Sequence, residues 1–154
     1  LGADDLIDHA KLEREIETPI CLDESIYSLQ DVKIAAALGS GKIINIKAGR
    51  VGGLSEAKKI HDYCKEHGLA VWCGGMLEAG VGRAQNIALS SLDHFLIPGD
   101  TSPSKRYWQE DIISPEVEME NGVIKIPAKP GIGFEINWDV LEAHRICKKV
   151  YKNL

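Results

Sequence analysis

Several features that would indicate a membrane, secreted or nucleic-acid-binding protein are missing from this 154-residue sequence. No apolar run approaches the roughly 20 residues of a membrane-spanning helix, and no charged-then-apolar leader opens the chain. Basic residues are not in excess, since 18 Lys and Arg stand against 23 Asp and Glu, and the formal charge of -5 leaves no basic face. The sequence therefore predicts a protein with neither a membrane nor a nucleic acid as its partner.

Cysteine pairs and several familiar cofactor motifs are missing too. The four cysteines form no C-x-x-C pair and no zinc-ligand spacing, and Cys21 and Cys73 lie in strand-like runs where a thiol packs as a small apolar group. This pattern predicts reduced thiols and a cytoplasmic location. The chain has no G-x-S-x-G elbow, no Walker A loop and no complete G-x-G-x-x-G fingerprint, because Gly80-Val81-Gly82 lacks the third glycine.

What the sequence does contain is a repeating order of strand, turn and helix, with a spacing of about 25 residues. Ser28 and Asp31 resemble a capping box, and Gly39 and Gly68 are placed to end two helices. This rhythm is typical of a parallel sheet in which a crossover helix follows each strand. Strands are predicted at 20–22, 43–46, 69–73 and 95–97, and helices at 3–16, 28–38, 54–67 and 79–92. Side chains expected to face the core include Leu54, Ala57, Ile60, Cys64, Ala84, Ile87 and Ala88.

The pattern changes after Asp100. Asn121-Gly122 is a dipeptide typical of tight hairpins, and prolines and glycines between residues 127 and 133 argue against regular structure from there to the terminal helix. Asn137 can cap that last helix, which would carry Val140, Leu141 and Val150. We therefore expect residues 1–101 to form one α/β unit and residues 102–154 to form a tail with a hairpin and a terminal helix.

Charged side chains follow the first two predicted strands. Asp23 and Glu24 come directly after the first, and a carboxylate there is a hard oxygen ligand suited to Mg²⁺. Lys47 ends the second strand beside a glycine-rich turn, and Arg50 follows three residues later. Because α/β enzymes build their sites at the carboxyl ends of parallel strands, Lys47 is the candidate acid/base group. Each residue also has a structural interpretation, as a loop cap, a solvated charge or an exposed ion-pair partner.

The third predicted strand ends in Gly74-Gly75-Met76-Leu77-Glu78. Bare backbone amides and carbonyls beside an apolar side chain suit a carboxylate- or amide-bearing substrate with an apolar body, although an ordinary strand-to-helix turn would also explain the run. Arg83 and Asn86 on the next helix are interpreted as structural. Asp100 has two interpretations, a contact near the substrate or an ordinary turn aspartate.

Taken together and in this order, three motifs resemble the muconate-lactonising subgroup of the enolase superfamily. They are Asp23-Glu24-Ser25, the run from Asn45 to Gly53, and the run from Gly74 to Glu78. Within the subgroup, the chain is most similar to the o-succinylbenzoate synthase / N-acylamino acid racemase family, and the resemblance covers essentially the whole chain. It implies an α/β fold that is the C-terminal half of a (β/α)7β TIM-type barrel, strand-helix units four to eight, with a tail that would return to a missing capping domain.

The resemblance also implies roles for the charged residues. Asp23 would be a carboxylate ligand of an essential Mg²⁺, with Glu24 and Arg50 in supporting roles. Lys47 would be the acid/base lysine on one face of the substrate. The shared reaction step would be removal of the proton next to a metal-bound carboxylate of a small molecule. That step leads either to the dehydration that forms o-succinylbenzoate in menaquinone biosynthesis or to racemisation of N-acylamino acids.

The resemblance also implies a role for the glycine-rich run: Gly75, Met76 and Leu77 would line the pocket for the succinyl or acyl chain. The family's other metal carboxylates and its first lysine lie on earlier strands. We therefore expect that the N-terminus was cut from something longer and that the isolated fragment is inactive.

Two further hypotheses remain open at this stage. The exposed edge strands of a half-barrel predict self-association into a homo-oligomer. A complete small flavodoxin-like domain, serving as a receiver or as a non-catalytic ligand-binding module, would also suit the length and the parallel strands. Its regular βα units would not account for the irregular residues 102–133.

Overall fold

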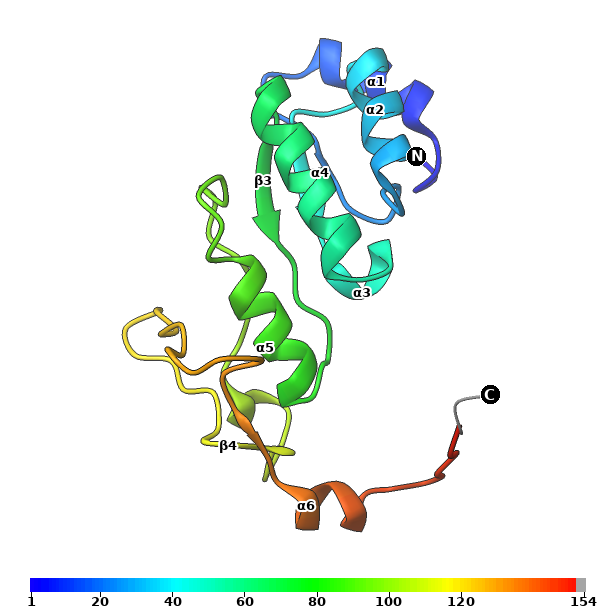
Figure 1. Cartoon of the computed structure of the whole chain (residues 1–154). Coiled ribbons are helices and arrows are strands. Elements are labelled where there is room, and N and C mark those ends of the chain that lie inside the picture. The colour runs from blue at the N-terminus through cyan, green and yellow to red at the C-terminus, as the bar shows by residue number, and fades with distance from the viewer. Residues whose placement is uncertain (152–154) are drawn as a thin grey trace.

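The computed structural model describes residues 1–151 (Figure 1), and its larger sheet has three parallel strands. The strands are β1 (Cys21–Leu22), β2 (Ile43–Ile46) and β3 (Ala70–Cys73), in the order β1-β2-β3. Ile44 is in register with Leu22 on one side and with Val71 on the other. Because the strands are parallel and in register, the residues that follow them come together at one edge of the sheet.

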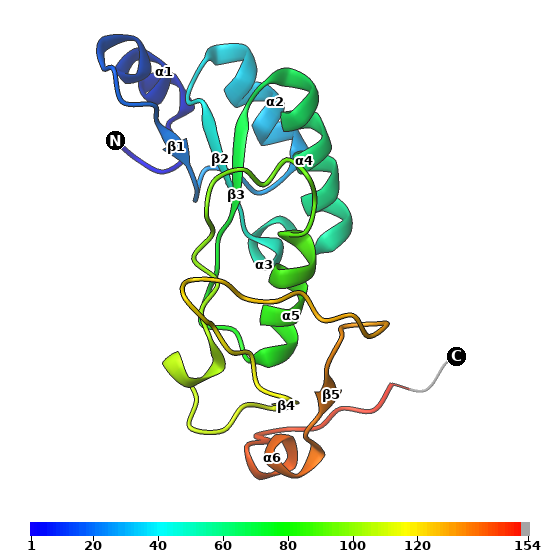
Figure 2. The same cartoon turned by 90° about the vertical axis from the view of Figure 1, so that its left-hand side faces the viewer.

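Two helices, α2 (Leu29–Leu38) and α4 (Leu54–His67), cover one face of this sheet (Figure 2). Strand side chains alternate between faces, and those toward the helices are at most 1% exposed. Burying each large aliphatic side chain contributes roughly 1.5–3 kcal/mol, so this layer is the main source of stability. Its members from the strands are Leu22, Ile44, Ile46, Val71 and Cys73, and its members from the helices include Val32, Ala35, Ala57, Ile60 and Cys64.

Helix boundaries follow the predicted capping signals. The Ser28 hydroxyl accepts a hydrogen bond from the Asp31 amide at 3.4 Å, and α2 begins at the next residue, Leu29. Gly39 and Gly68 take left-handed conformations with φ of 72° and 69° and end α2 and α4. The predicted Ser28 cap and both predicted helix ends are confirmed, although the Asp31 carboxylate accepts from the Tyr27 amide and not from the Ser28 amide as in a capping box.

Several expectations about the first hundred residues are wrong. Leu54 is 41% exposed, because it opens α4 before the helix reaches the sheet, and Ala88 on α5 (Gly80–Leu89) is also exposed. Cys21 is exposed because it lies on the face of the sheet opposite α2 and α4. The predicted strand at 95–97 is reduced to one parallel bridge between Val71 and Phe95.

A short helix, α3 (Ala48–Val51), replaces the glycine-rich turn predicted after Lys47. Gly52 ends it with a φ of 91°, a conformation that other residues rarely adopt. The consequence is that Arg50, three residues after Lys47, turns back toward the sheet instead of extending into a loop.

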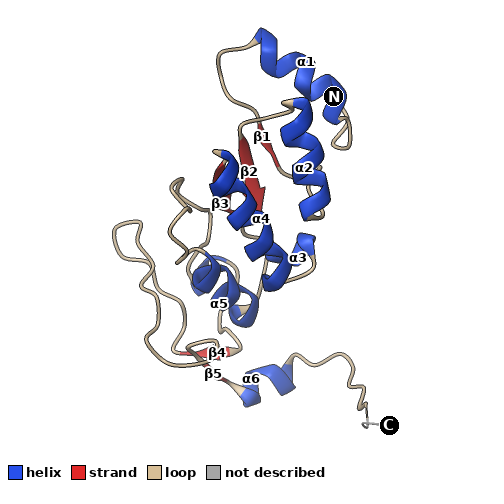
Figure 3. Cartoon of the chain, turned by 45° about the horizontal axis from the view of Figure 1, so that its top comes forward, coloured by secondary structure: helices blue, strands red, loops and turns tan. Residues whose placement is uncertain are grey.

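The remaining elements form a second, smaller cluster around α5 (Figure 3). Its core consists of Ile87, Ile113 and Val117, with Phe134 and Ile136 packed against it. The elements are η1 (Ser104–Arg106), the antiparallel pair β4 (Ile113–Ser114) and β5 (Glu135–Ile136), and α6 (Trp138–Ala143). A separate helix, α1 (Leu6–Glu15), lies beside α2 at the other end of the molecule. Within residues 1–151, no helix is both long and apolar enough to cross a bilayer.

Predictions for the tail are confirmed in part. Asn121 and Gly122 have φ of 52° and 79°, and Glu120 pairs with Val123, so the predicted tight turn is present with a single antiparallel bridge. Regular structure was not expected between the hairpin and Asn137, and β5 shows that this was wrong. The Asn137 cap is confirmed at 3.3 Å to the Val140 amide. The helix ends at Ala143, so Val150 lies outside it and is 74% exposed.

The helix is shorter than predicted because only one of its side chains, Val140, is buried, and short helices depend on tertiary packing. The proposed boundary between residues 101 and 102 stays a prediction.

Candidate active site

The structure brings Asp23, Lys47 and Arg50 together at the carboxyl end of the sheet. Lys47 Nζ donates to Asp23 Oδ2 at 2.9 Å, and Arg50 Nη1 donates to Asp23 Oδ1. The three side chains are partly enclosed, with exposures of 26% for Asp23, 15% for Lys47 and 11% for Arg50. One carboxylate therefore sits between two cations in a region only partly open to solvent.

Arg50 is fixed by three separate contacts. Besides the Asp23 carboxylate, Nε donates to the Ile26 carbonyl at 2.7 Å and Nη2 donates to the Asn45 carbonyl at 2.5 Å. A planar guanidinium is suited to such divergent acceptors, whereas an ammonium group is not. The helix α3 makes this possible, because it places Arg50 over the end of β2.

Glu24 does not join this cluster. It follows Asp23 directly, and its side chain is exposed. β1 ends at Leu22 and Glu24 lies in the turn that follows Asp23, so only one of the two carboxylates meets Lys47. Among residues 1–151, the structure gives Glu24 no hydrogen bond or ion pair with the cluster.

The segment from Gly74 to Glu78 leaves the same edge of the sheet, next to the end of β2. The Gly74 amide donates to the Ile46 carbonyl at 3.0 Å. Because Cys73 is in register with Ile46, the residues that follow them, Gly74 and Lys47, leave the sheet next to each other. The Gly75 amide donates to the Asp100 carboxylate. Met76 and Leu77 are 56% and 73% exposed, so two apolar side chains are presented to solvent. Asp100, expected either near the substrate or in an ordinary turn, in fact holds the backbone of this segment.

Asn45 connects the cluster to the segment. It is fully buried, and neither atom of its side-chain amide has a hydrogen-bond partner among the described residues. A Cβ at Gly74 would lie 2.3 Å from Asn45 Oδ1, so only glycine fits there. This explains the first glycine of the run by close packing.

A buried polar network lies behind the segment and was largely missed from the sequence. Arg83, 1% exposed, donates from Nη1 to Asp111 Oδ2 at 2.9 Å and from Nη2 to the Glu78 carbonyl at 2.8 Å. Ser104 Oγ donates to the same Asp111 oxygen at 2.6 Å. Asn86 Nδ2 donates to Glu78 Oε1 at 3.0 Å. The geometry agrees with the structural roles expected for Arg83 and Asn86, whereas Ser104 and Asp111 lie too far along the chain for any local pattern to indicate them.

The described residues offer few ligands for a metal ion. Among residues 1–151, no three His, Cys, Asp or Glu side chains gather into a group that could hold one. Asp23 offers the hard oxygen that Mg²⁺ prefers, but both of its oxygens contact cationic side chains. Asp23 therefore fits the role of one oxygen ligand, and the described residues do not supply a complete site.

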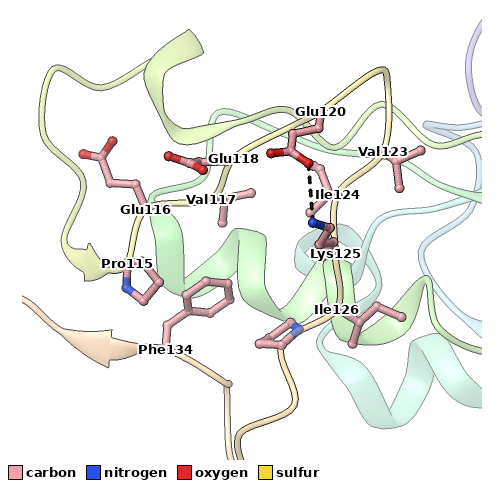
Figure 4. Close-up of a pocket in the computed structure, with 11 residues that line it drawn as sticks. Pro115, Glu116, Val117, Glu118, Glu120, Val123, Ile124, Lys125, Ile126 and Phe134 are labelled. Atoms are coloured by element: carbon pink, nitrogen blue, oxygen red, sulfur yellow. Dashed lines mark hydrogen bonds and ion pairs between the residues drawn. The ribbon is translucent and has the colours of Figure 1, made fainter.

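A hollow of about 240 Å³ lies elsewhere, in the tail (Figure 4). Apolar side chains such as Val117, Ile124 and Phe134 line it, with Glu116, Glu118 and Glu120 at its rim. None of the predicted site residues lines it, so it is separate from the cluster around Asp23.

Comparison with known proteins identifies relatives along nearly the whole chain. Residues 1–140 match the family described as enolase C-terminal domain-like. The chain is 58% identical to the o-succinylbenzoate synthase of Geobacillus kaustophilus over 151 residues, which is 98% of this chain and 40% of that protein. It is 52% identical to the N-succinylamino acid racemase of Amycolatopsis sp over 133 residues, 86% of this chain and 36% of that one. The chain thus spans about 40% of the length of the curated relatives it matches.

Solved structures agree with these relatives. A member of the enolase superfamily from Listeria innocua superposes with a TM-score of 0.90 at 49% identity, covering 93% of this chain and 38% of that one. The 2-chloromuconate cycloisomerase of Rhodococcus opacus superposes with a TM-score of 0.88 at 22% identity, covering 94% and 39%, which is a likeness of fold alone. The expected fold class, the C-terminal part of an enolase-type barrel, is confirmed.

Proposed function

Because the chain belongs to the enolase superfamily and is homologous to o-succinylbenzoate synthases and N-succinylamino acid racemases, we propose that it supplies Lys47 as an acid/base group for one of these reactions. The observation that carries the proposal is the position of Lys47 at the carboxyl end of the parallel sheet, 2.9 Å from Asp23 and beside the Gly74 segment. The family match sets the flavodoxin-like alternative aside.

Lys47 would move a proton at the substrate carbon next to a carboxylate. Paired with Asp23, the ammonium group has a proton to return to that carbon, and once neutral it can accept one. In racemisation this exchange is the reaction on one face of the carbon. In the dehydration, the positive charge of Lys47 would stabilise the enolate formed at the same position. Both reactions begin with removal of the proton next to the carboxylate, and the proposal covers both roles of Lys47.

Asp23 would contribute one oxygen ligand to Mg²⁺, with Arg50 holding the carboxylate in place and Glu24 in an outer supporting role. When bound, such an ion supplies positive charge for the substrate carboxylate and for the enolate. Gly75, Met76 and Leu77 would contact the succinyl or acyl chain of the substrate, because they follow the end of β3 next to β2 and the side chains of Met76 and Leu77 are exposed. We expect the 154-residue chain alone to be inactive, since it provides one carboxylate and one lysine of the family's set.

The compartment and the assembly are also part of the proposal. The cytoplasm is proposed because the four cysteines are unpaired thiols. Self-association is proposed because β1 lies at the outer end of the sheet order and its edge can pair with another chain. Sedimentation over a hundredfold range of concentration tests this, and a monomer throughout would contradict it.

The test of the reaction is a chimera in which this chain replaces the matching part of the Geobacillus kaustophilus enzyme. We expect the chimera to form o-succinylbenzoate or to racemise N-succinylamino acids with added Mg²⁺, and Lys47→Ala to lower kcat by about 10²–10⁴-fold. Turnover of both substrates is measured by absorbance and polarimetry.

Lys58→Ala is the matched control, because Lys58 is an exposed lysine on α4 paired with Asp62. It should leave kcat unchanged. A folded chimera without either activity would refute the proposed reaction, and full activity in Lys47→Ala would refute the role of Lys47. Activity of the 154-residue chain alone would show that the missing groups are not needed.

A further inference from the structure

The substrate-facing segment between β3 and α5 lacks packing of its own. Residues 74–79 belong to no helix or strand, and the side chains of Met76 and Leu77 are mostly exposed. Side chains in such a segment sample many positions unless the backbone beneath them is fixed. The position of Met76 and Leu77 therefore depends on what anchors their backbone.

Glu78 provides that anchor on both of its polar groups. Its carboxylate accepts the Met76 amide, with both oxygens at 2.8 Å, and accepts Asn86 Nδ2 at 3.0 Å. Its carbonyl accepts Arg83 Nη2 at 2.8 Å and Trp108 Nε1 at 3.1 Å. We call Glu78 with these four partners the Glu78 clamp. It closes a tight loop around Leu77, the most exposed residue of the segment.

The clamp is backed by rigid, buried groups from distant parts of the chain. Arg83 and Asn86 lie on α5 and are 1% and 3% exposed, and Arg83 is held in turn by the fully enclosed Asp111 carboxylate. Trp108 also belongs to the tail, thirty positions after Glu78. The charge-assisted hydrogen bond between the buried Arg83 and Asp111 side chains fixes the guanidinium that holds the Glu78 carbonyl.

We propose that Glu78 is a positioning residue that fixes Met76 and Leu77 for the acyl part of the substrate, with residues 104–111 of the tail as its support. This inference rests on the proposed function, in which Met76 and Leu77 contact that part. Glu78 acts through the backbone of the segment and does not touch the reacting carbon. In this proposal the contacts to the acyl chain are the same before and during the reaction, and loss of such uniform binding raises KM more than it lowers kcat.

Glu78→Ala in the chimera described above is the first test. We expect KM for the succinyl-bearing substrate to rise about tenfold while kcat falls less than threefold. Glu78→Gln keeps an acceptor oxygen for the Met76 amide and should recover most of the KM. Glu66→Ala, an exposed glutamate on α4, is the control and should change neither constant.

Amide hydrogen exchange of Met76, followed by NMR in the 154-residue chain, is the second readout and needs no activity. We expect Glu78→Ala to accelerate exchange of this amide at least tenfold, Glu78→Gln to give an intermediate rate and Glu66→Ala to give the original rate. A merely structural role would instead raise exchange across the whole of α5 together with a lower unfolding midpoint.

The outcomes separate the two proposals. An inactive chimera refutes the proposed reaction, while Met76 exchange alone then decides whether the clamp exists. Unchanged exchange in Glu78→Ala overturns the clamp, and a fall in kcat at constant KM overturns its positioning role. If Glu78→Ala does not fold, Trp108→Phe is the second variant, because it removes one donor to the Glu78 carbonyl from a side chain that is 36% exposed. It should raise KM about threefold, and an unchanged KM would overturn the proposal.

Discussion

At the scale of single residues, the site depends on groups whose shape matters as much as their charge. Asp23 and Lys47 were expected to matter from their positions after strands, and the structure places them in contact. Arg50 was predicted only to support them. Its three contacts, to a carboxylate and two carbonyls, explain why the position needs a guanidinium and not simply a positive charge.

Arg50→Lys should therefore destabilise the fold although the charge is kept. An ammonium group can satisfy one of the three acceptors, and two lost hydrogen bonds cost about 1–3 kcal/mol. Urea unfolding of the 154-residue chain measures this as a lower midpoint at constant slope. Arg145→Lys, on an exposed arginine near the C-terminus, should leave the midpoint unchanged. Equal midpoints for both variants would contradict the interpretation of Arg50.

Gly74→Ala should also destabilise the chain. The new methyl group would lie 2.3 Å from Oδ1 and 2.8 Å from Cγ of the fully buried Asn45, so this side chain would have to shift. Overpacking of this kind costs about 1–3 kcal/mol, again measured by urea unfolding.

Gly49→Ala provides the contrast, because nothing lies within 4 Å of a Cβ at Gly49 and the residue is inside α3. It should be neutral or stabilise the chain by up to about 1 kcal/mol. A Gly74→Ala variant as stable as the parent would show that Asn45 can rearrange.

At the scale of elements, apolar periodicity and capping residues predicted the bounds of those helices that depend only on nearby residues. The periodicity of 54–67 and the glycine at 68 defined α4 to the residue, because an amphipathic stripe and a left-handed cap both act within a few positions. The strand at 95–97 and the helix through Val150 were wrong for the opposite reason. Those lengths depend on neighbouring surfaces, and an apolar run alone does not say whether a neighbour is present.

The candidate site divides in the same way. Asp23, Lys47 and the Gly74 segment could be predicted, because parallel strands bring their carboxyl ends together whatever the rest of the chain does. The contact of Asp111 with Arg83 could not be predicted, since it joins positions 28 residues apart through the irregular tail. No periodicity or capping rule reaches over that distance.

Glu56 links two elements and gives the fold a pH dependence. Its carboxylate accepts the Leu29 amide at the start of α2 at 3.0 Å. That hydrogen bond, with a further contribution from Lys59, lowers the pKa of Glu56 below its ordinary value of 4.5. Because folding lowers the pKa of Glu56, its charged carboxylate stabilises the folded chain at pH values above 4.5. This contribution is lost as the pH falls from 4.5 through the lowered pKa.

Glu56→Gln should therefore lower the urea midpoint at pH 7, and the difference should shrink as the pH falls below 4.5 towards the lowered pKa of Glu56. Glu66→Gln, on the same helix and exposed, should have no effect at any pH in this range. A midpoint difference that is as large at pH 3 as at pH 7 would exclude linkage through the charge of Glu56.

At the scale of the whole molecule, the main core can be followed through its cysteines. Burial raises the pKa of the Cys64 thiol to about 12 and that of Cys73 to about 11, and both belong to the cluster between the sheet and α2 and α4. Cys21 and Cys147 are exposed, although partial desolvation also raises the pKa of Cys21. The thiols should therefore fall into two groups of reactivity.

We expect a disulfide reagent at pH 8 to modify Cys21 and Cys147 in the folded chain and all four cysteines in guanidinium chloride. Cys64 and Cys73 should react at the same rate in mild denaturant, because a single core opens as one unit. Mass spectrometry of the labelled peptides measures both rates. Prompt labelling of Cys64 without Cys73 would show that α4 detaches separately from the sheet.

The contact between Trp72 and Cys21 has an optical consequence. The indole Nε1 of Trp72 donates to Cys21 Sγ at 3.2 Å on the face of the sheet that α2 and α4 leave uncovered. Thiols quench indole emission, so the protein carries a fluorophore and its quencher on the surface that a closed barrel would enclose. Covering that surface would remove water from the partly exposed Trp72 and shift its emission to shorter wavelength. Barrel closure can thus be timed in a stopped-flow fluorimeter without any attached dye.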